Sequence, residues 1–287
     1  MSSDREFLGL TPAGTPGHYR FTVENHLARL DGRLYGGTAI AVSIAASELV
    51  SDRAALWMTT QFVSTAPAEE EIRVHAEVLA PGRRTNQVRV TGSDADGQVM
   101  FASLGATGHR RDDGLAGTFE HPPEVSTPDR SEPRGGPFAA MLRNAGVEAE
   151  VPMPRDVGFN RVVEFREPAV TSHPDPGPGR VCMWARRRDG APVTPAILAF
   201  IADMVPLSVA HGCGVVAGGI SLDNTIRIGS ADPSEWVLVD LRAHLATGDY
   251  GHGAAHLWSE SGALLATASQ SASMIRFDLD DAPWNRS

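Results

Sequence analysis

Cysteine is scarce in this chain of 287 residues, which contains only Cys182 and Cys213. Two cysteines outside a C-x-x-C pair cannot build a disulfide framework, so we expect a reducing compartment. The first six residues lack the apolar segment of a secretory signal, and no stretch approaches the roughly 18 apolar residues that a membrane helix needs. The sequence therefore predicts a cytoplasmic protein with no membrane partner.

Several functional signatures are also missing. The net charge is −10, and the chain lacks the clustered basic residues that nucleic acids require, so no nucleic-acid partner is expected. The ten histidines form no metal-ligand pattern, and we expect neither a metal site nor a cofactor. No G-x-S-x-G motif is present, which argues against the nucleophile elbow of α/β-hydrolases.

Apolar residues make up 42% of the chain, enough for a core, and their pattern predicts secondary structure. A beta-rich stretch at 18–30 precedes an apolar run at 38–50, whose length and lack of alternation favour a buried helix. Turn residues then separate four predicted strands, at 55–63, 72–79, 87–92 and 99–107.

The second half repeats this order. Predicted strands at 161–167 and 181–187 precede an apolar helix at 195–209, for which Thr194 is the expected N-cap and Pro195 the first helical residue. Four strands follow, at 221–228, 236–246, 253–258 and 264–275. Matching turns recur at an offset of about 165 residues, which indicates a duplication. The alternative is that the strand and turn patterns of the two halves are similar by coincidence.

Between the halves, residues 109–137 are rich in proline, glycine and aspartate, and they indicate a connector with little regular structure. We therefore predict an N-terminal domain at 1–110, a connector at 111–150 and a C-terminal domain at 151–287.

Four short motifs occur in order along the chain: G-R-L-Y-G-G-T at 32–38, A-D-M-V-P-L at 202–207, S-L-D-N-T at 221–225 and S-Q-S-A-S-M-I-R at 269–276. Together they resemble the motifs of the acyl-CoA thioesterase II (TesB-like) family. The corresponding family motifs are G-x-x-[FY]-G-G-Q, with Thr38 in place of its glutamine, the Ser-Asp-x-x-x-Leu-Pro helix, the Thr-Ile-Asp-His-Ser strand and the closing Val-Gln-Glu-Gly-x-x-Arg. The resemblance implies an α+β double hot-dog fold, in which two fused domains each wrap an antiparallel sheet around a buried helix.

The resemblance also implies the activity and its residues. Acyl-CoA would be hydrolysed to free fatty acid and CoA, in lipid metabolism, by a homo-oligomer (a dimer or tetramer of double hot-dogs). The family's catalytic residues fall on Asp203, Ser221 and Gln270. Its oxyanion and substrate-binding residues fall on Gly36, Gly37 and Thr38. Backbone N–H groups at that helix start, together with the helix dipole, would stabilise the oxyanion.

Asp203 is the most informative single residue because it interrupts an almost wholly apolar run. Burying a carboxylate is costly unless it is satisfied, and burial raises its pKa toward the range of a general base. The alternative is a solvent-facing aspartate at a helix end. Asp223 and Thr225 follow Ser221 at strand spacing, so they are expected on its face, and Asp223 is a rival acid.

Two other functions stay open. A non-catalytic protein that binds acyl-CoA or acyl-carrier protein is favoured by Thr38 and opposed by the three retained polar residues. A hot-dog dehydratase would need a histidine and an acid on a helix, and neither predicted helix carries a histidine until His211, at the far end of the second. We also predict one site per chain, because the offset from the second copy leads to apolar or small residues near Trp57, Ala39 and Gly105.

Overall fold

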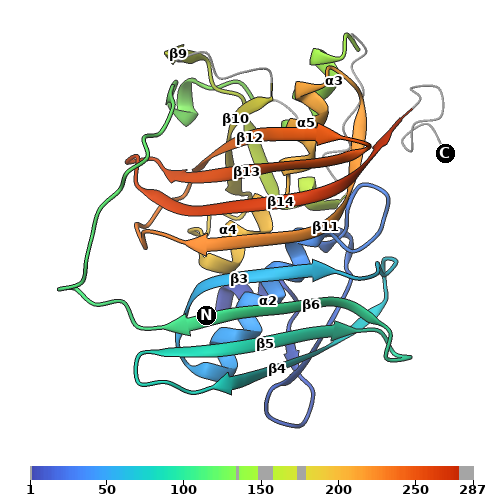
Figure 1. Cartoon of the computed structure of the whole chain (residues 1–287), viewed down its shortest axis with the longest axis vertical. Helices are drawn as coiled ribbons and strands as arrows, with labels where there is room; N and C mark the ends of the chain where they lie inside the picture. The colour runs from blue at the N-terminus through green and yellow to red at the C-terminus, as the bar shows by residue number, and fades with distance from the viewer. Residues whose placement is uncertain (1, 134–135, 148–157, 173–178, 278–287) are drawn as a thin grey trace.

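The structure is a computed structural model that describes residues 2–133, 136–147, 158–172 and 179–277. Its main feature is one twelve-stranded antiparallel sheet (Figure 1). The strands, in order across the sheet, are β1 (Thr11–Pro12), β2 (His18–Thr22), β4 (Glu71–Ala80), β5 (Thr85–Ser93), β6 (Val99–Gly108), β3 (Ala54–Phe62), β11 (Ala217–Ile228), β14 (Leu264–Arg276), β13 (Tyr250–Ser259), β12 (Val237–Thr247), β10 (Arg180–Arg187) and β8 (Val163–Arg166).

The two halves meet where β3 pairs with β11. At the centre of this pair, the hydroxyl groups of Thr59 and Thr225 form a hydrogen bond of 2.7 Å. Within the twelve-stranded sheet, each half of the described chain also carries three β-bulges, in matching places. They fall at Leu56, Leu79 and Met100 in the first half and at Leu222, His244 and Leu265 in the second. Since bulges are specific local features, their matched positions support a duplication over a chance echo.

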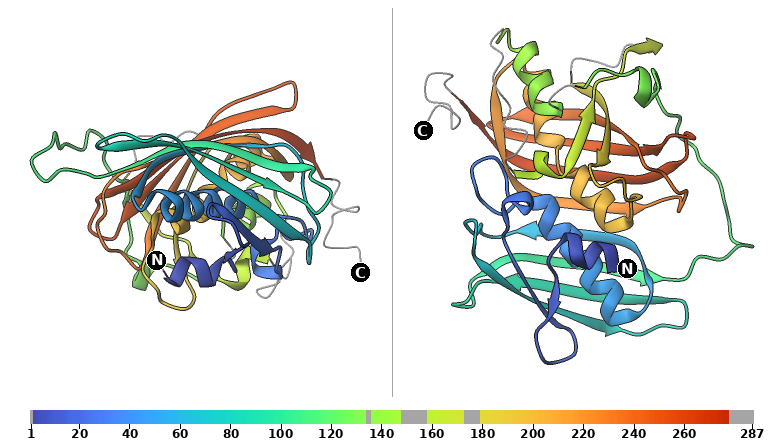
Figure 2. Two further views of the ribbon diagram at one scale, coloured as in Figure 1. Left: turned by 90° about the horizontal axis from the view of Figure 1, so that it is seen from below. Right: turned by 180° about the vertical axis from the view of Figure 1, so that it is seen from behind.

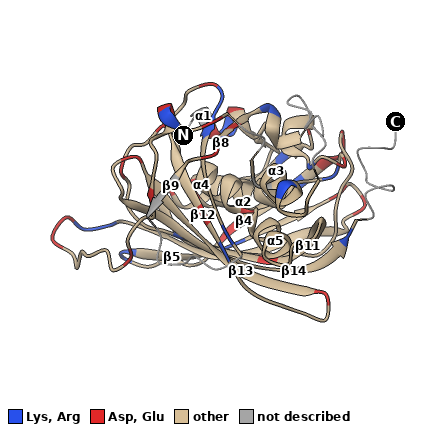
Figure 3. Ribbon diagram, turned by 90° about the horizontal axis from the view of Figure 1, so that it is seen from above, with Lys and Arg blue, Asp and Glu red and all other residues tan. Residues whose placement is uncertain are grey.

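Helices fill the concave side of each half (Figure 2). The first half wraps around α2 (Gly36–Ser51), and the second around α5 (Val205–Gly212), while α4 (Pro195–Ala202) packs against α2. The central helices α2 and α4 carry almost no charged residues. The charged residues of the protein lie mainly around its periphery (Figure 3). This arrangement confirms the predicted α+β double hot-dog fold, in which each half of the continuous antiparallel sheet wraps around a buried helix.

The predicted single helix at 195–209 is wrong in one respect, because the structure breaks it into α4 and α5. Thr194 caps α4, accepting a hydrogen bond from the Ile197 N–H, as expected. Pro206 has no N–H, and in a continuous helix its ring would clash with the Ala202 carbonyl, so the chain bends between them. Asp203 lies in this bend, with non-helical backbone angles.

The expectation that no stretch approaches the length of a membrane helix needs correction. The 18 residues Pro195–Gly212 are apolar and long enough to cross a membrane by composition, but 78% of this stretch is buried inside the protein. Burial of this kind is ordinary for the core helices of a globular domain.

The connector crosses the outer face of the second half of the sheet. Its strand β7 (Glu124–Val125) pairs with β9 (Val170–Ser172), and the Ser126 carbonyl accepts a 2.8 Å hydrogen bond from the Trp184 indole.

The remaining short elements are α1 (Ser2–Phe7), η1 (Asn25–Leu27), η2 (Pro128–Arg130), α3 (Gly136–Asn144) and η3 (Gly158–Arg161). The domain boundaries at 110 and 150 stay a prediction; residues 134–135 and 148–150 of the connector lie outside the described residues.

Candidate active site

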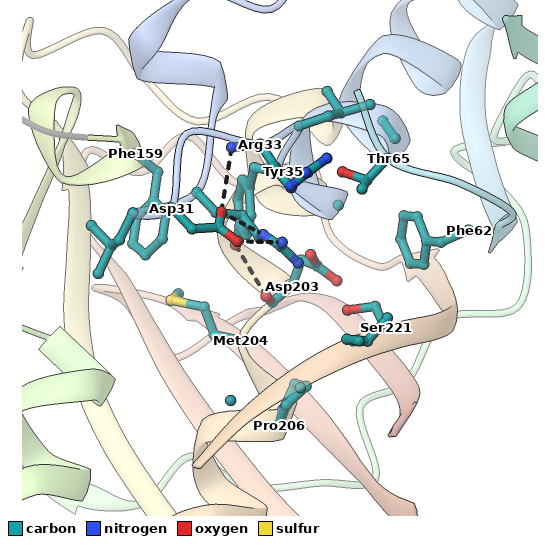
Figure 4. Close-up of a pocket in the computed structure, with 18 of the residues that line it drawn as sticks. Asp31, Arg33, Tyr35, Phe62, Thr65, Phe159, Asp203, Met204, Pro206 and Ser221 are labelled. Atoms are coloured by element: carbon teal, nitrogen blue, oxygen red, sulfur yellow. Dashed lines mark hydrogen bonds and ion pairs between the residues drawn. The ribbon is translucent and has the colours of Figure 1, made fainter. Parts of the chain in front are cut away.

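A cavity of about 610 Å³ opens at the junction of the two halves. Most of its wall is apolar and includes Phe62, Phe138, Phe159 and Met204. Asp203 lies in the middle of the cavity wall (Figure 4). A mostly apolar cleft with a few converging polar groups is the usual form of a small-molecule site.

Asp203 is 7% exposed, and amide groups hold one of its two carboxylate oxygens. Its Oδ1 accepts hydrogen bonds from Gln270 Nε2 at 2.7 Å and from Asn224 Nδ2 at 3.0 Å. The same Gln270 Nε2 donates to Ser221 Oγ at 2.8 Å. The structure therefore brings together the three predicted residues Asp203, Ser221 and Gln270, which come from the α4–α5 bend, β11 and β14.

Burial raises the pKa of Asp203 to about 7, against an ordinary value of 3.8. The amide of Asn224 opposes this rise most strongly, followed by the Gly37 backbone N–H, the charge of Arg29 and the amide of Gln270. A carboxyl group with such a pKa is part ionised at neutral pH, and it can accept a proton from water and return it to a leaving group.

The second carboxylate oxygen, Oδ2, lies beside Gly36 at the start of α2. A Cβ atom on Gly36 would collide with Oδ2 and with the Phe62 ring, and one on Gly37 would collide with the Phe200 carbonyl. Neither glycine has a positive φ. Gly36 is therefore required for the close approach of α2 to Asp203, and Gly37 for its close approach to α4, and neither is required for a tight turn.

Of the three residues predicted at this helix start, Thr38 needs correction. Its side chain is fully buried, its hydroxyl donates to the Leu27 carbonyl at 2.8 Å, and its N–H donates to the Tyr35 carbonyl. Because both groups are occupied by the protein itself, Thr38 supports the loop before α2 and does not contact a ligand in the cavity. Gly36 lines the cavity, whereas the Gly37 N–H lies beside the Asp203 carboxylate.

Comparisons with known proteins bear on the chemistry of this site. The model of the acyl-CoA thioesterase C-terminal domain matches residues 130–274, and that of the N-terminal domain matches residues 27–107. This chain belongs to the acyl-CoA thioesterase family. It is a thioester hydrolase, and acyl-CoA is the substrate that the family implies.

Solved structures agree with this assignment. A protein assigned as a thioesterase from Novosphingobium aromaticivorans is 31% identical, with a TM-score of 0.77 over 92% of this chain and 97% of its own. Two others show the shared fold: a hot-dog protein of unknown function from Alicyclobacillus acidocaldarius (19%, TM-score 0.78, 96% and 99% coverage) and the acyl-CoA thioesterase II TesB2 from Mycobacterium marinum (17%, 0.72, 96% and 99%). A search of curated proteins finds no match.

Two residues of the candidate site were not predicted from the sequence. Asn224 is fully buried and binds Asp203 Oδ1, and it stands where the resembled family has a histidine. Tyr35, within the N-terminal motif, donates a 3.1 Å hydrogen bond to the Asp203 backbone carbonyl and stacks on Phe159. The sequence did offer a signal for both residues, because each is a polar side chain, an amide in Asn224 and a phenol in Tyr35, inside a motif that matches the family.

Asp223 and Thr225 do not share the site, which corrects the expectation that they lie on the face of Ser221. The bulge at Leu222 changes the alternation of β11, so that Asn224 joins Ser221 at the site. Asp223 instead accepts a hydrogen bond from the Ser271 backbone, and Thr225 binds Thr59.

Among the described residues, the candidate site has no equivalent in the first half. The matched bulges make Ala55 the counterpart of Ser221 and Gly105 the counterpart of Gln270. The same offset leads from Asp203 to Gly37, whereas the sequence alone indicated Ala39. The counterparts carry no carboxylate, hydroxyl or amide side chain, and the N-terminal half contributes the α2 start and Tyr35 instead.

Proposed function

We propose that this enzyme hydrolyses acyl-CoA to free fatty acid and CoA through a water molecule activated by Asp203. The observation that carries the proposal is that the two oxygens of the Asp203 carboxylate have different surroundings. Two amides fix Oδ1, while Oδ2 lies beside Gly36 on the cavity wall, and the pKa of the group is about 7. A buried, oriented base of this pKa is suited to deprotonating water near neutral pH.

In the proposed reaction, the water oxygen attacks the thioester carbonyl carbon while its proton passes to Asp203 Oδ2. The carbonyl oxygen becomes an oxyanion. When the intermediate collapses, the C–S bond breaks, and Asp203 returns the proton to the CoA sulfur. Ser221 Oγ and Gln270, which are already hydrogen-bonded to each other, would orient the attacking water. No covalent enzyme intermediate is needed.

The oxyanion would be received at the N-terminus of α2. Among the described residues, no acceptor is found for the Gly36 N–H, and Gly36 lines the cavity. The helix dipole adds positive potential at this end. We therefore assign the oxyanion donor to the Gly36 N–H, whereas the Gly37 N–H, the donor expected from the sequence, stabilises the Asp203 carboxylate.

The test is a panel of acyl-CoA substrates of increasing chain length, followed by release of free thiol, with wild type and Asp203→Asn side by side. Turnover by the wild type and its loss in the variant are the expected results. Turnover by Asp203→Asn at the wild-type rate would exclude the mechanism. A wild type that binds acyl-CoA without turnover would favour the alternative, a non-catalytic binding protein, although Thr38, its main support, does not contact the cavity.

We also propose, from the scarce cysteine and the acidic composition, that the enzyme acts in the cytoplasm, in lipid metabolism, without a membrane or nucleic-acid partner. A homo-oligomer, either a dimer or a tetramer, is part of the same proposal. Light scattering of the purified enzyme tests the oligomer.

A further inference from the structure

The two ends of the active-site cavity differ in chemistry. On one side of Asp203 the wall includes Asp31, Arg33 and Thr65, and Arg29, which also lines the cavity, is hydrogen-bonded to Asp31 (Figure 4). On the other side it is formed by apolar groups such as Met204 and Pro206 (Figure 4). A thioester of CoA has the same polarity, because its acyl chain is apolar and its other end carries phosphates.

Arg29 and Arg33 are held in a small, rigid hairpin. Ala28 pairs with Leu34, and the Arg29 N–H donates to the Arg33 carbonyl at 2.7 Å, so the two arginines stand opposite each other. Gly32, with a φ of 73°, closes the turn. The Gly32 carbonyl accepts a hydrogen bond from the Ala68 N–H, and the Leu34 N–H donates to the Ala66 carbonyl, which anchors the hairpin to the next segment.

This pair of like charges is not explained by the stability of the hairpin. Opposed residues of an antiparallel pair place their side chains on the same face, where like charges are unfavourable. The carboxylate of Asp31 neutralises the charge of Arg29 only, from which it accepts two hydrogen bonds of 3.1 and 2.6 Å. The exposed Arg33 side chain has no ion pair or hydrogen bond within the described part of the chain. The positive charge of Arg33 therefore has no partner in the described part of the chain, although the whole chain has a net charge of −10.

We propose that Arg33, assisted by Arg29, binds a phosphate group of the CoA half of the substrate. This proposal rests on the proposed function, and it fixes the orientation of the thioester, with the acyl chain toward Met204 and Pro206. A guanidinium group binds phosphate through paired, charge-assisted hydrogen bonds, and the rigid hairpin lowers the entropy that binding costs.

The experiment compares Arg33→Gln with wild type on two thioesters of one acyl group, the CoA ester and the N-acetylcysteamine ester, which has no phosphate. For the CoA ester, we expect KM to rise about tenfold with kcat within about twofold. For the N-acetylcysteamine ester, both constants should match wild type. Free CoA should inhibit the variant correspondingly less, and Arg33→Lys, which keeps the charge, should restore part of the affinity. Arg130→Gln, at an exposed arginine outside the cavity, is the matched control.

Equal KM values of Arg33→Gln and wild type for the CoA ester would overturn the phosphate site. So would an equal rise of KM for both esters, because Arg33 would then act on the part that they share. Either result leaves the proposed function intact as long as the wild type hydrolyses the CoA ester. A wild type that hydrolyses neither ester would instead contradict the proposed function.

Discussion

The Nδ2 group of Asn224 donates a 3.0 Å hydrogen bond to Oδ1 of Asp203, inside the protein and away from solvent. This bond favours the charged form of the carboxyl group and lowers its pKa. Its loss in Asn224→Ala should raise the pKa of Asp203, so the acid limb of kcat/KM against pH should move to higher pH. The loss of activity should thus be larger at pH 6 than at pH 9.

The control for this prediction is the next residue along β11. Thr225 faces away from the site and binds Thr59, so Thr225→Val should leave the position of the acid limb unchanged. An unshifted limb in Asn224→Ala would show that Asn224 supports the fold only.

Asp203→Asn should fold and should lower kcat by at least about 10²-fold, which is the usual loss on removal of a general base. Steady-state kinetics on purified, folded variant provide the measurement. An effect confined to KM would indicate a binding role for Asp203 and contradict the mechanism.

The raised pKa of Asp203 also predicts how stability depends on pH. With a folded-state pKa of about 7 and an ordinary value of 3.8, the folded state holds more protons between these two pH values. The contribution of this group to stability therefore falls as the pH rises from about 4 to 7. Asp203→Asn, which removes the ionisation, should gain Tm relative to wild type at pH 8 and lose that advantage near pH 4. A constant difference in Tm across this range would contradict the raised pKa.

Ser221 should be needed for its hydroxyl group and not for its size. Ser221→Thr keeps the bond from Gln270 Nε2 and should stay active, whereas Ser221→Ala should raise the barrier by about 1–3 kcal/mol. Measured kcat/KM values for the two variants decide this. Equal activity of both would remove Ser221 from the site.

Each chain should contain one active site. The first half has Ala55 and Gly105 where the second has Ser221 and Gln270, so it lacks the groups that hold and activate water. Calorimetric titration with a non-hydrolysable acyl-CoA analogue should saturate at one ligand per chain. Two equivalent binding sites, or hydrolysis by a separately expressed first half, would contradict the assigned residues.

Much of the fold could be predicted from the sequence because the strands are long, patterned and separated by strong turn signals. The predicted strand at 99–107, for example, is β6 at Val99–Gly108. The division of the second helix had a signal in Pro206, but the apolar run on both sides favoured a continuous helix. Helix α3 was not predicted, because the proline and glycine around it hide any helical periodicity. It packs on α5, which is a tertiary contact that the local sequence does not indicate.

The candidate site was predictable to the extent that its residues lie in recognisable motifs. Asp203 stood out because a carboxylate in an apolar run needs partners. Asn224 was missed because a strand pattern places alternate residues on one face, and the bulge at Leu222 is not visible in the sequence. Thr38 was misplaced because a motif reports that a residue matters without saying whether its side chain faces the ligand or the loop behind it.

The position of β14 has a consequence for synthesis of the enzyme. This strand comes last among the described strands, yet it lies between β11 and β13 in the sheet. Until the ribosome has released it, β11 and β13 each present an unpaired edge, and such edges are templates for aggregation. Gln270 also lies on β14, so the nascent polypeptide gains the amide that binds Asp203 and covers these two strand edges in the same step.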